Sequence, residues 1–287
     1  MQSDESSRFE KYRGQETVVT LVSQSDNPIK TIGTKAFLSC KTIEKLILPD
    51  TLEVVEDWGF AHMKNLREIV LPAKEISFGK KVFLGCEKLE KVCLLRRSSD
   101  TLYEGMPYFL ASMFRYFPES HLAHLGIAGD DCGQWKWLED YDEALLRYIA
   151  MPHDYDFEPA FIGWFDVEDV DDQKEHFVRQ QRKDKVYLAF RRLNYAEGLS
   201  EYHMESLQDF LLGEKQLVEQ LFLDADEPLG KEVGDYYIWE QTGTLDENCI
   251  DRLMAVIPEE EPEIRGYLLK IQLEHVENND FFQELDL

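Results

Sequence analysis

The sequence predicts an α+β protein in which a short solenoid of stacked repeats is followed by an all-helical domain. Apolar side chains recur every 23 residues as far as residue 97, where this repeat stops. Beyond that point the apolar spacing becomes helical, and most of the negative charge of the chain lies there. We therefore expect a solenoid over residues 16–97 and an acidic helical domain over residues 98–287.

The repeat is visible in three segments, 29–51, 52–74 and 75–97, which align without a gap. One such unit is too small to bury its own apolar side, so the units must stack and share one interior. Five apolar columns result from the alignment: Phe37, Phe60 and Phe83; Cys40, Met63 and Cys86; Ile43, Leu66 and Leu89; Leu46, Ile69 and Val92; Leu48, Leu71 and Leu94.

Within each repeat the spacing predicts a strand, a turn and a helical turn. Leu46 and Leu48 alternate as two inward side chains of a strand, and Pro49 ends that strand. Phe37 and Cys40 lie three residues apart, which is the spacing of one helical turn. We therefore expect a right-handed β/α superhelix.

A partial first repeat or cap is expected at Glu16–Val22, since TVVTLV is typical of a strand. This segment does not fit the 23-residue register of the other repeats.

The repeat pattern IGxxAFxxCxxLxxIxLPxxL resembles the BspA-type leucine-rich repeats of bacterial proteins. The second repeat departs from it at Glu56 and Gly59, and the third at Leu95 and at a shifted Ile76, which indicates that the array is ending. The resemblance covers about 80 residues and implies a binding surface without catalytic residues in the repeats. The matching positions are Ile32-Gly33, Ala36-Phe37, Cys40, Ile43, Leu46 and Leu48-Pro49.

Several helices are expected after Arg97. PYFLASMFRYF, preceded by a possible capping box at Thr101 and Glu104, is expected to join the solenoid to the helical domain. A second capping box at Thr244 and Glu247 begins the clearest helical hairpin. The domain should therefore be a helical-hairpin array of ankyrin-like or HEAT-like type, with residues 154–173 as a long loop. The helical stripes are Leu145, Leu146 and Ile149; Val186, Phe190 and Leu193; Met204, Leu207 and Leu211; Leu217, Val218, Leu221 and Phe222; Ile250, Leu253, Met254 and Ile257; Ile264, Tyr267, Leu268 and Ile271.

The net charge of −26 is unevenly distributed. Residues 1–97 carry 16 Lys and Arg against 14 Asp and Glu, whereas residues 98–287 carry 15 against 43. This field repels phosphate backbones and anionic lipids, so nucleic acid and membrane surfaces are not expected as partners. It favours a basic protein partner, although an acidic face that only keeps the domain soluble would give the same composition.

The amino-terminal composition predicts a cytoplasmic protein. Residues 1–15 hold no apolar stretch of the kind found in secretory signals, and no apolar run in the chain is long enough to span a bilayer. Proteins with BspA-type leucine-rich repeats, which this sequence resembles, are in contrast often secreted. The five cysteines are odd in number and lack metal-like spacing, so free thiols are expected.

Two groups of potential metal ligands do not complete a site. His121 and His124 are followed by Asp130, Asp131 and Cys132, but the spacing supplies no fourth ligand. A second, acidic group lacks the glycine and the bidentate glutamate of a calcium loop. That acidic group consists of Asp166, Glu168, Asp169, Asp171 and Asp172.

The chain also lacks the nucleophile-elbow, phosphate-loop and dinucleotide motifs. We therefore expect no catalytic, cofactor-binding or metal-binding residues. The alternative is an enzyme or metalloprotein with a site in residues 118–175, near His121, His124 and Trp164.

The better candidate is the outward face of the repeat strands. Alternation places Ile47, Val70 and Cys93 outward as neighbours. An apolar ladder on an open solenoid face predicts that it is covered, either by a protein partner or by the helical half of the chain. Lys45, Glu68 and Lys91 flank the ladder, and Trp58 is a possible separate anchor. The sequence thus predicts a non-catalytic protein-interaction scaffold.

Overall fold

The structure, a computed structural model, describes residues 7–95, 105–117, 132, 134–155, 157–158 and 170–285, with side chains described as far as residue 274. The described residues form two compact units. The first extends to Tyr148 and includes Glu197–Leu199, and the second comprises Ile149–Ala196 and the chain from Ser200 onward. The strands all lie in the first unit, together with α1 (Met106–Tyr116) and most of α3 (Trp135–Ala150), and the described elements of the second unit are helices, which confirms the predicted α+β class.

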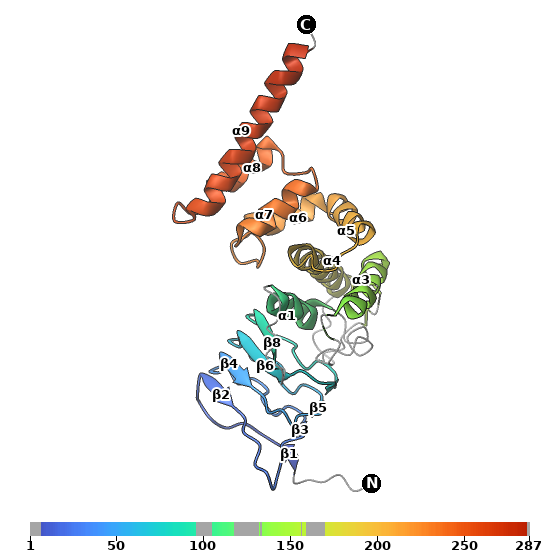
Figure 1. Cartoon of the computed structure of the whole chain (residues 1–287), viewed down its shortest axis with the longest axis vertical. Coiled ribbons are helices and arrows are strands. Elements are labelled where there is room, and N and C mark those ends of the chain that lie inside the picture. Colours follow the sequence, from blue (N-terminus) through green and yellow to red (C-terminus); the bar gives the residue numbers. More distant parts are fainter. Residues whose placement is uncertain are drawn as a thin grey trace. The chain divides into compact units, whose positions relative to one another are not determined.

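Two parallel sheets run along the solenoid, one strand of each per coil (Figure 1). The first sheet has the order β1 (Arg8–Phe9), β3 (Thr31–Ile32), β5 (Val54–Val55) and β7 (Ser77–Phe78). The second has the order β2 (Val18–Thr20), β4 (Lys45–Ile47), β6 (Glu68–Pro72) and β8 (Lys91–Leu95). Apart from β2 and β4, neighbouring strands pair 23 residues apart, as Lys45 does with Glu68 and Glu68 with Lys91.

The interior of the solenoid is a column of aromatic rings flanked by aliphatic rows. The ring centroids of Phe37 and Phe60 lie 5.7 Å apart, and those of Phe60 and Phe83 lie 5.4 Å apart. Phe9 extends the column at one end, 5.3 Å from Phe37. Phe114 extends it at the other end, 4.7 Å from Phe83. The predicted shared interior is therefore confirmed.

The third side of each coil consists of successive turns, and the predicted helical turn is wrong. Lys35, Trp58 and Lys81 occupy the same place in three coils, and each has a left-handed backbone with φ between 54° and 60°. A residue in this conformation interrupts a right-handed helix. The amides that a helix would use internally instead reach the next coil, as where Phe37 N donates to Gly59 O at 2.8 Å.

The strand in Glu16–Val22 forms part of a first coil, as predicted, and it is out of the 23-residue register of the other repeats, also as predicted. β2 pairs in parallel with β4 at an offset of 27, Val18 with Lys45, whereas β1 pairs with β3 at an offset of 23, Arg8 with Thr31. In the first coil the segment between β1 and β2 is thus shorter than in the next coil, and the segment after β2 is longer by the same number of residues. An alignment without gaps cannot detect this compensation.

Ion pairs between exposed side chains also follow the repeat step. Each exposed pair contributes only about 0–1 kcal/mol, so their effect is to favour the register and not to hold the coils together. The pairs are Lys30–Glu53 at 3.2 Å, Lys45–Glu68 at 2.7 Å, Lys64–Glu87 at 3.6 Å and Arg67–Glu90 at 2.6 Å.

Helix α1 (Met106–Tyr116) closes one end of the solenoid by packing against β8, which confirms the predicted joining helix. The predicted capping box at Thr101 and Glu104 lies outside the described residues. Helix α3 (Trp135–Ala150) follows, and Phe109 of α1 meets the ring of Tyr141 edge-on at 4.9 Å.

The second unit is an array in which each helix packs against its partner and its neighbours. The packed pairs are α4 with α5 and α7, α6 with α5 and α8, and α9 with α7 and α8. The pair of α8 and α9 is the predicted carboxyl-terminal hairpin. The helices are α4 (Val170–Asn194), α5 (Glu201–Gly213), α6 (Lys215–Leu223), α7 (Val233–Gln241), α8 (Glu247–Val256) and α9 (Pro262–Leu285).

Two details of this array differ from the sequence-based expectation. Asp246 caps α8, since its carboxylate accepts from Cys249 N at 2.8 Å, whereas Thr244 accepts from Trp239 Nε1 at 3.0 Å. The predicted capping box at Thr244 and Glu247 is therefore wrong. Helix α7 was not predicted, because its aromatic residues do not form a single stripe.

Replacing Phe60 with alanine should destabilise the protein by about 3–5 kcal/mol, because it leaves a cavity in the middle of the aromatic column. Urea unfolding followed by tyrosine and tryptophan fluorescence would measure the change. Leu84→Ala, in the next coil at a side chain that is 44% exposed, is the matched control and should change the free energy by under about 1 kcal/mol. Equal effects of the two variants would contradict a shared aromatic interior.

Candidate protein-binding surface

The predicted apolar ladder lies on the outward side of the second sheet. Ile47, Val70 and Cys93 are opposite one another in neighbouring strands, and each is half-buried. Their inward neighbours, among them Leu46 and Ile69, are completely buried. The strand alternation therefore has the phase that the sequence predicts.

A row of polar side chains runs beside this ladder and is paired within itself. Lys45 Nζ lies 2.7 Å from Glu68 Oε1, and the Cys93 thiol lies 3.8 Å from the same oxygen. Lys91 Nζ stands 5.0 Å from the ring centroid of Tyr108 on α1. The charged groups of Lys45, Glu68 and Lys91 thus all have contacts within the protein itself.

The protonation states suit a binding surface better than a reactive centre. Burial raises the pKa of the Cys93 thiol, and the adjacent Glu68 carboxylate raises it further. Cys93 is therefore a protonated, weakly polar side chain at neutral pH and not a nucleophile. The hydrogen bond to Tyr108 raises the pKa of Lys91, which keeps its charge.

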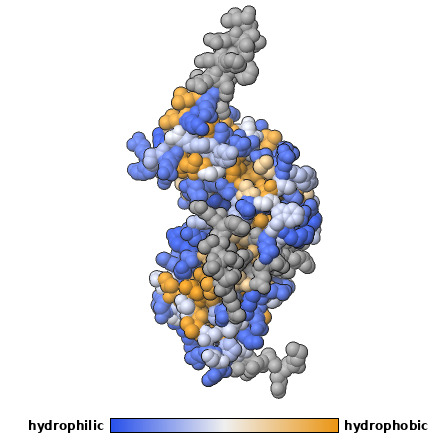
Figure 2. All heavy atoms as spheres, in the orientation of Figure 1, coloured by the Kyte–Doolittle hydropathy of each residue, from blue (hydrophilic) through white to orange (hydrophobic). Residues whose placement is uncertain are grey.

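Further exposed apolar side chains lie beside the ladder, whereas the residue of β2 that pairs with Ile47 is Thr20. Val18 and Val22 of the first coil are 55% and 73% exposed, and Leu95 at the end of β8 is 55% exposed. Figure 2 shows apolar side chains gathered over the strands of the solenoid. The apolar surface is therefore wider than the three residues that the sequence singled out.

Trp58 lies apart from the other six candidates, on the stacked turns. Its ring is half-buried, with Lys81 Nζ at 5.4 Å and the His62 ring at 6.3 Å from its centroid. The chain turns between β5 and β6 at this point, so Trp58 is not part of the second sheet. The structure thus brings Lys45, Ile47, Glu68, Val70, Lys91 and Cys93 together and separates Trp58 from them.

Most of the alternative site falls outside the described residues. This applies to His121, His124, Asp130, Asp131, Trp164, Asp166, Glu168 and Asp169. Cys132 is buried, and Asp171 and Asp172 lie in the first turn of α4. Within the described ranges, no three His, Cys, Asp or Glu side chains are placed to hold a metal ion.

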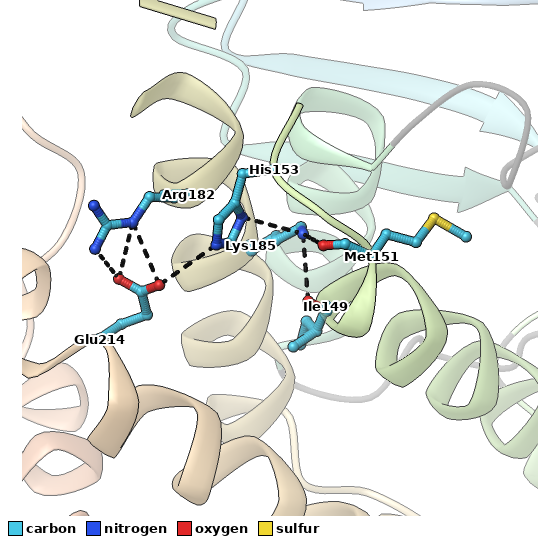
Figure 3. Close-up of polar contacts among 6 residues, drawn as sticks. All are labelled: Ile149, Met151, His153, Arg182, Lys185 and Glu214. Atoms are coloured by element: carbon cyan, nitrogen blue, oxygen red, sulfur yellow. Dashed lines mark hydrogen bonds and ion pairs between the residues drawn. The ribbon is translucent and has the colours of Figure 1, made fainter. Parts of the chain in front are cut away.

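Sequence reasoning missed a polar cluster in the second unit, around Lys185 of α4 (Figure 3). Lys185 is completely buried, and its ammonium group donates to Met151 O at 2.6 Å and to Ile149 O at 3.3 Å. His153 Nδ1 lies 3.3 Å from the same nitrogen. These residues are distant in sequence, so no local motif reveals the cluster.

The remaining members of the cluster surround His153 and Glu214. Arg182 donates to Glu214 through two nitrogens, the shorter contact being 2.5 Å, and His153 Nε2 lies 3.8 Å from Glu214 Oε1. Burial lowers the pKa of Lys185, and Glu214 counteracts this effect. The Lys185 ammonium is enclosed and donates to main-chain carbonyls, so the cluster holds the carboxyl-terminal end of α3 against α4. It does not present a reactive amine.

Comparison with known proteins identifies the solenoid. Residues 15–106 match the family described as BspA type leucine-rich repeat region, in six copies. This part of the chain is a BspA-type leucine-rich-repeat region. No curated protein and no solved structure matches the chain. Leucine-rich repeats generally serve as scaffolds for protein interaction, and the comparisons offer no support for the enzyme or metalloprotein alternative.

None of the helices among the described residues is long and apolar enough to cross a membrane.

Acidification should destabilise the protein through His153. Burial lowers the pKa of this imidazole below its ordinary value of 6.5, and the Lys185 ammonium lowers it further, while Glu214 opposes the shift. The unfolded chain therefore binds the proton more readily, and stability decreases as the pH falls below about 6.5 towards the folded-state pKa.

His153→Gln, which keeps a polar side chain but does not titrate, should make this pH dependence shallower. Urea unfolding of both proteins between pH 7.5 and 5.5 would measure the two slopes. His176→Gln, the same substitution at an exposed position of α4, is the control for replacing a histidine by glutamine. An unaltered slope for His153→Gln would show that the shift is not linked to folding.

Proposed function

We propose that this protein is a non-catalytic scaffold for protein interaction, and that its leucine-rich-repeat strand face contacts a protein partner. The observation that carries the proposal is the half-exposed ladder of Ile47, Val70 and Cys93 on the outward side of the second sheet. An apolar ladder on a face that normally meets water becomes favourable when a partner covers it.

The chemistry of the surface supports recognition of an apolar segment. Burying apolar area contributes roughly 25 cal/mol per Å², so the affinity would come from the ladder and the valines beside it. The polar row would contribute orientation, because Lys45 and Glu68 are already paired and add little net energy. Trp58 would contribute only if the partner also reaches the stacked turns.

The acidic part of the chain favours a basic partner. Residues 98–287 carry 43 Asp and Glu against 15 Lys and Arg, which creates a negative field around the helices. Such a field raises the association rate of a basic protein and weakens as salt is added. We therefore propose a basic protein partner whose association slows as ionic strength rises.

The thiols of the repeats support a role without catalysis. Burial raises the pKa of Cys86 to about 12, so this thiol stays protonated at neutral pH. Burial also raises the pKa values of Cys40 and Cys93. None of these three thiols is an activated nucleophile, as expected for side chains that fill the repeat interior or its face.

Val70→Glu should abolish partner binding with little loss of stability, because it places a charge in the middle of the apolar ladder. Tagged protein would be cross-linked in lysate of the native host, and the bound proteins would be quantified by mass spectrometry. The partner should be basic and should be lost from the variant at least tenfold. Urea unfolding of the variant would be measured in parallel.

Leu212→Glu is the matched control, because Leu212 of α5 is an apolar side chain that is 46% exposed outside the solenoid. It should retain the partner. A large loss of stability in Val70→Glu would instead indicate that the helical half of the chain covers the ladder. Unchanged capture by Val70→Glu would show that the face is not the binding surface.

A further inference from the structure

We infer that the protein forms a two-fold dimer in which the open edge of β2 pairs with β2 of a second copy. The two ends of the second sheet differ. At one end α1 packs against β8, so this end is covered. At the other end β2 is the edge strand of the sheet among the residues that the structure describes.

The hydrogen bonds of β2 identify the groups that face the open edge. Thr17 O accepts from Lys45 N at 3.1 Å, and Leu21 N donates to Ile47 O at 2.9 Å. In a parallel ladder the bonds to one neighbour use alternate residues, so the odd-numbered residues of this segment bond to β4. The main-chain groups of Val18, Thr20 and Val22 therefore point to the open edge.

This edge lacks the features that normally prevent strand pairing. Exposed edges usually carry charges or proline, which block the approach of another strand. Thr17–Val22 has the sequence TVVTLV, with neither a charge nor a proline. Val18 and Val22 are 55% and 73% exposed, so the edge also presents apolar side chains.

The edge is self-complementary, which favours a second copy of this chain as its occupant. In an antiparallel pair centred on Thr20, each Thr20 lies opposite Thr20 of the other copy. Val18 of each copy then lies opposite Val22 of the other, so no like charges meet along the paired segment. A two-fold interface requires this kind of match between a surface and itself.

The pairing would satisfy the outward main-chain groups of all three residues in both copies and bury the valines against each other. The interface is small, so the dimer should depend on concentration and should not be permanent. The edge adjoins the outward ladder, since Thr20 pairs with Ile47. The dimer nevertheless requires no protein partner, so association of the purified chain tests it separately from the proposed function.

Thr20→Lys and Thr20→Glu test the dimer, because each places two like charges at the two-fold axis. Sedimentation velocity should show a monomer–dimer equilibrium for the unaltered protein and at least tenfold weaker association for each variant. An equimolar mixture of the two variants should restore the dimer, since lysine then faces glutamate. High salt should weaken this mixed dimer.

Two further variants guard against effects on folding. Val22→Lys changes a side chain that is already 73% exposed and should also weaken association at least tenfold. Ser77→Lys, an exposed position of β7 in the other sheet, should associate as the unaltered protein does. The inference is overturned if the unaltered protein is monomeric up to several hundred micromolar, or if Val22→Lys and both Thr20 variants dimerise normally.

Discussion

The stacking of one phenylalanine per coil is the contact on which the rest of the solenoid depends. Phe37, Phe60 and Phe83 follow each other at ring distances of 5.7 and 5.4 Å, and this spacing sets the distance between coils. Once the coils have this spacing, strands 23 residues apart come within hydrogen-bonding distance. The ion pairs between coils and the outward ladder follow from the same step, because every side chain lies beside its counterpart in the next coil.

The two ends of the phenylalanine column are covered by different parts of the chain. Phe114 of α1 continues the column beyond Phe83, and Arg115 donates to Leu89 O at 3.3 Å, so helix α1 supplies both apolar and polar contacts to the last coil. Phe9 and Tyr12 cover Phe37 at the other end, but they come from the first coil itself. The interior is thus protected at both ends, whereas within the described ranges the second sheet has a covering helix only beside β8.

The sequence predicts this architecture well where a side chain must be buried at every twenty-third residue. It predicts poorly where the backbone conformation determines the local structure. The apolar columns locate the strands because burial is repeated in every coil. The helical turn was mispredicted because Lys35, Trp58 and Lys81 adopt left-handed backbones that glycine would have signalled. The cluster around Lys185 could not be found, since residues more than 30 positions apart meet only after the helices pack.

The same distinction applies to the surface. Alternation along the strands is enough to place Ile47, Val70 and Cys93 on one face, but Trp58 shares no alternation with them, and only the path of the coil separates it. A face of this kind grows with every added coil, whereas an edge does not, so an array of few coils offers a small face. Pairing through β2 about an axis perpendicular to the sheet would keep the outward faces of both copies on one side. Two short ladders would then form one longer surface, which is the gain that further repeats would otherwise supply.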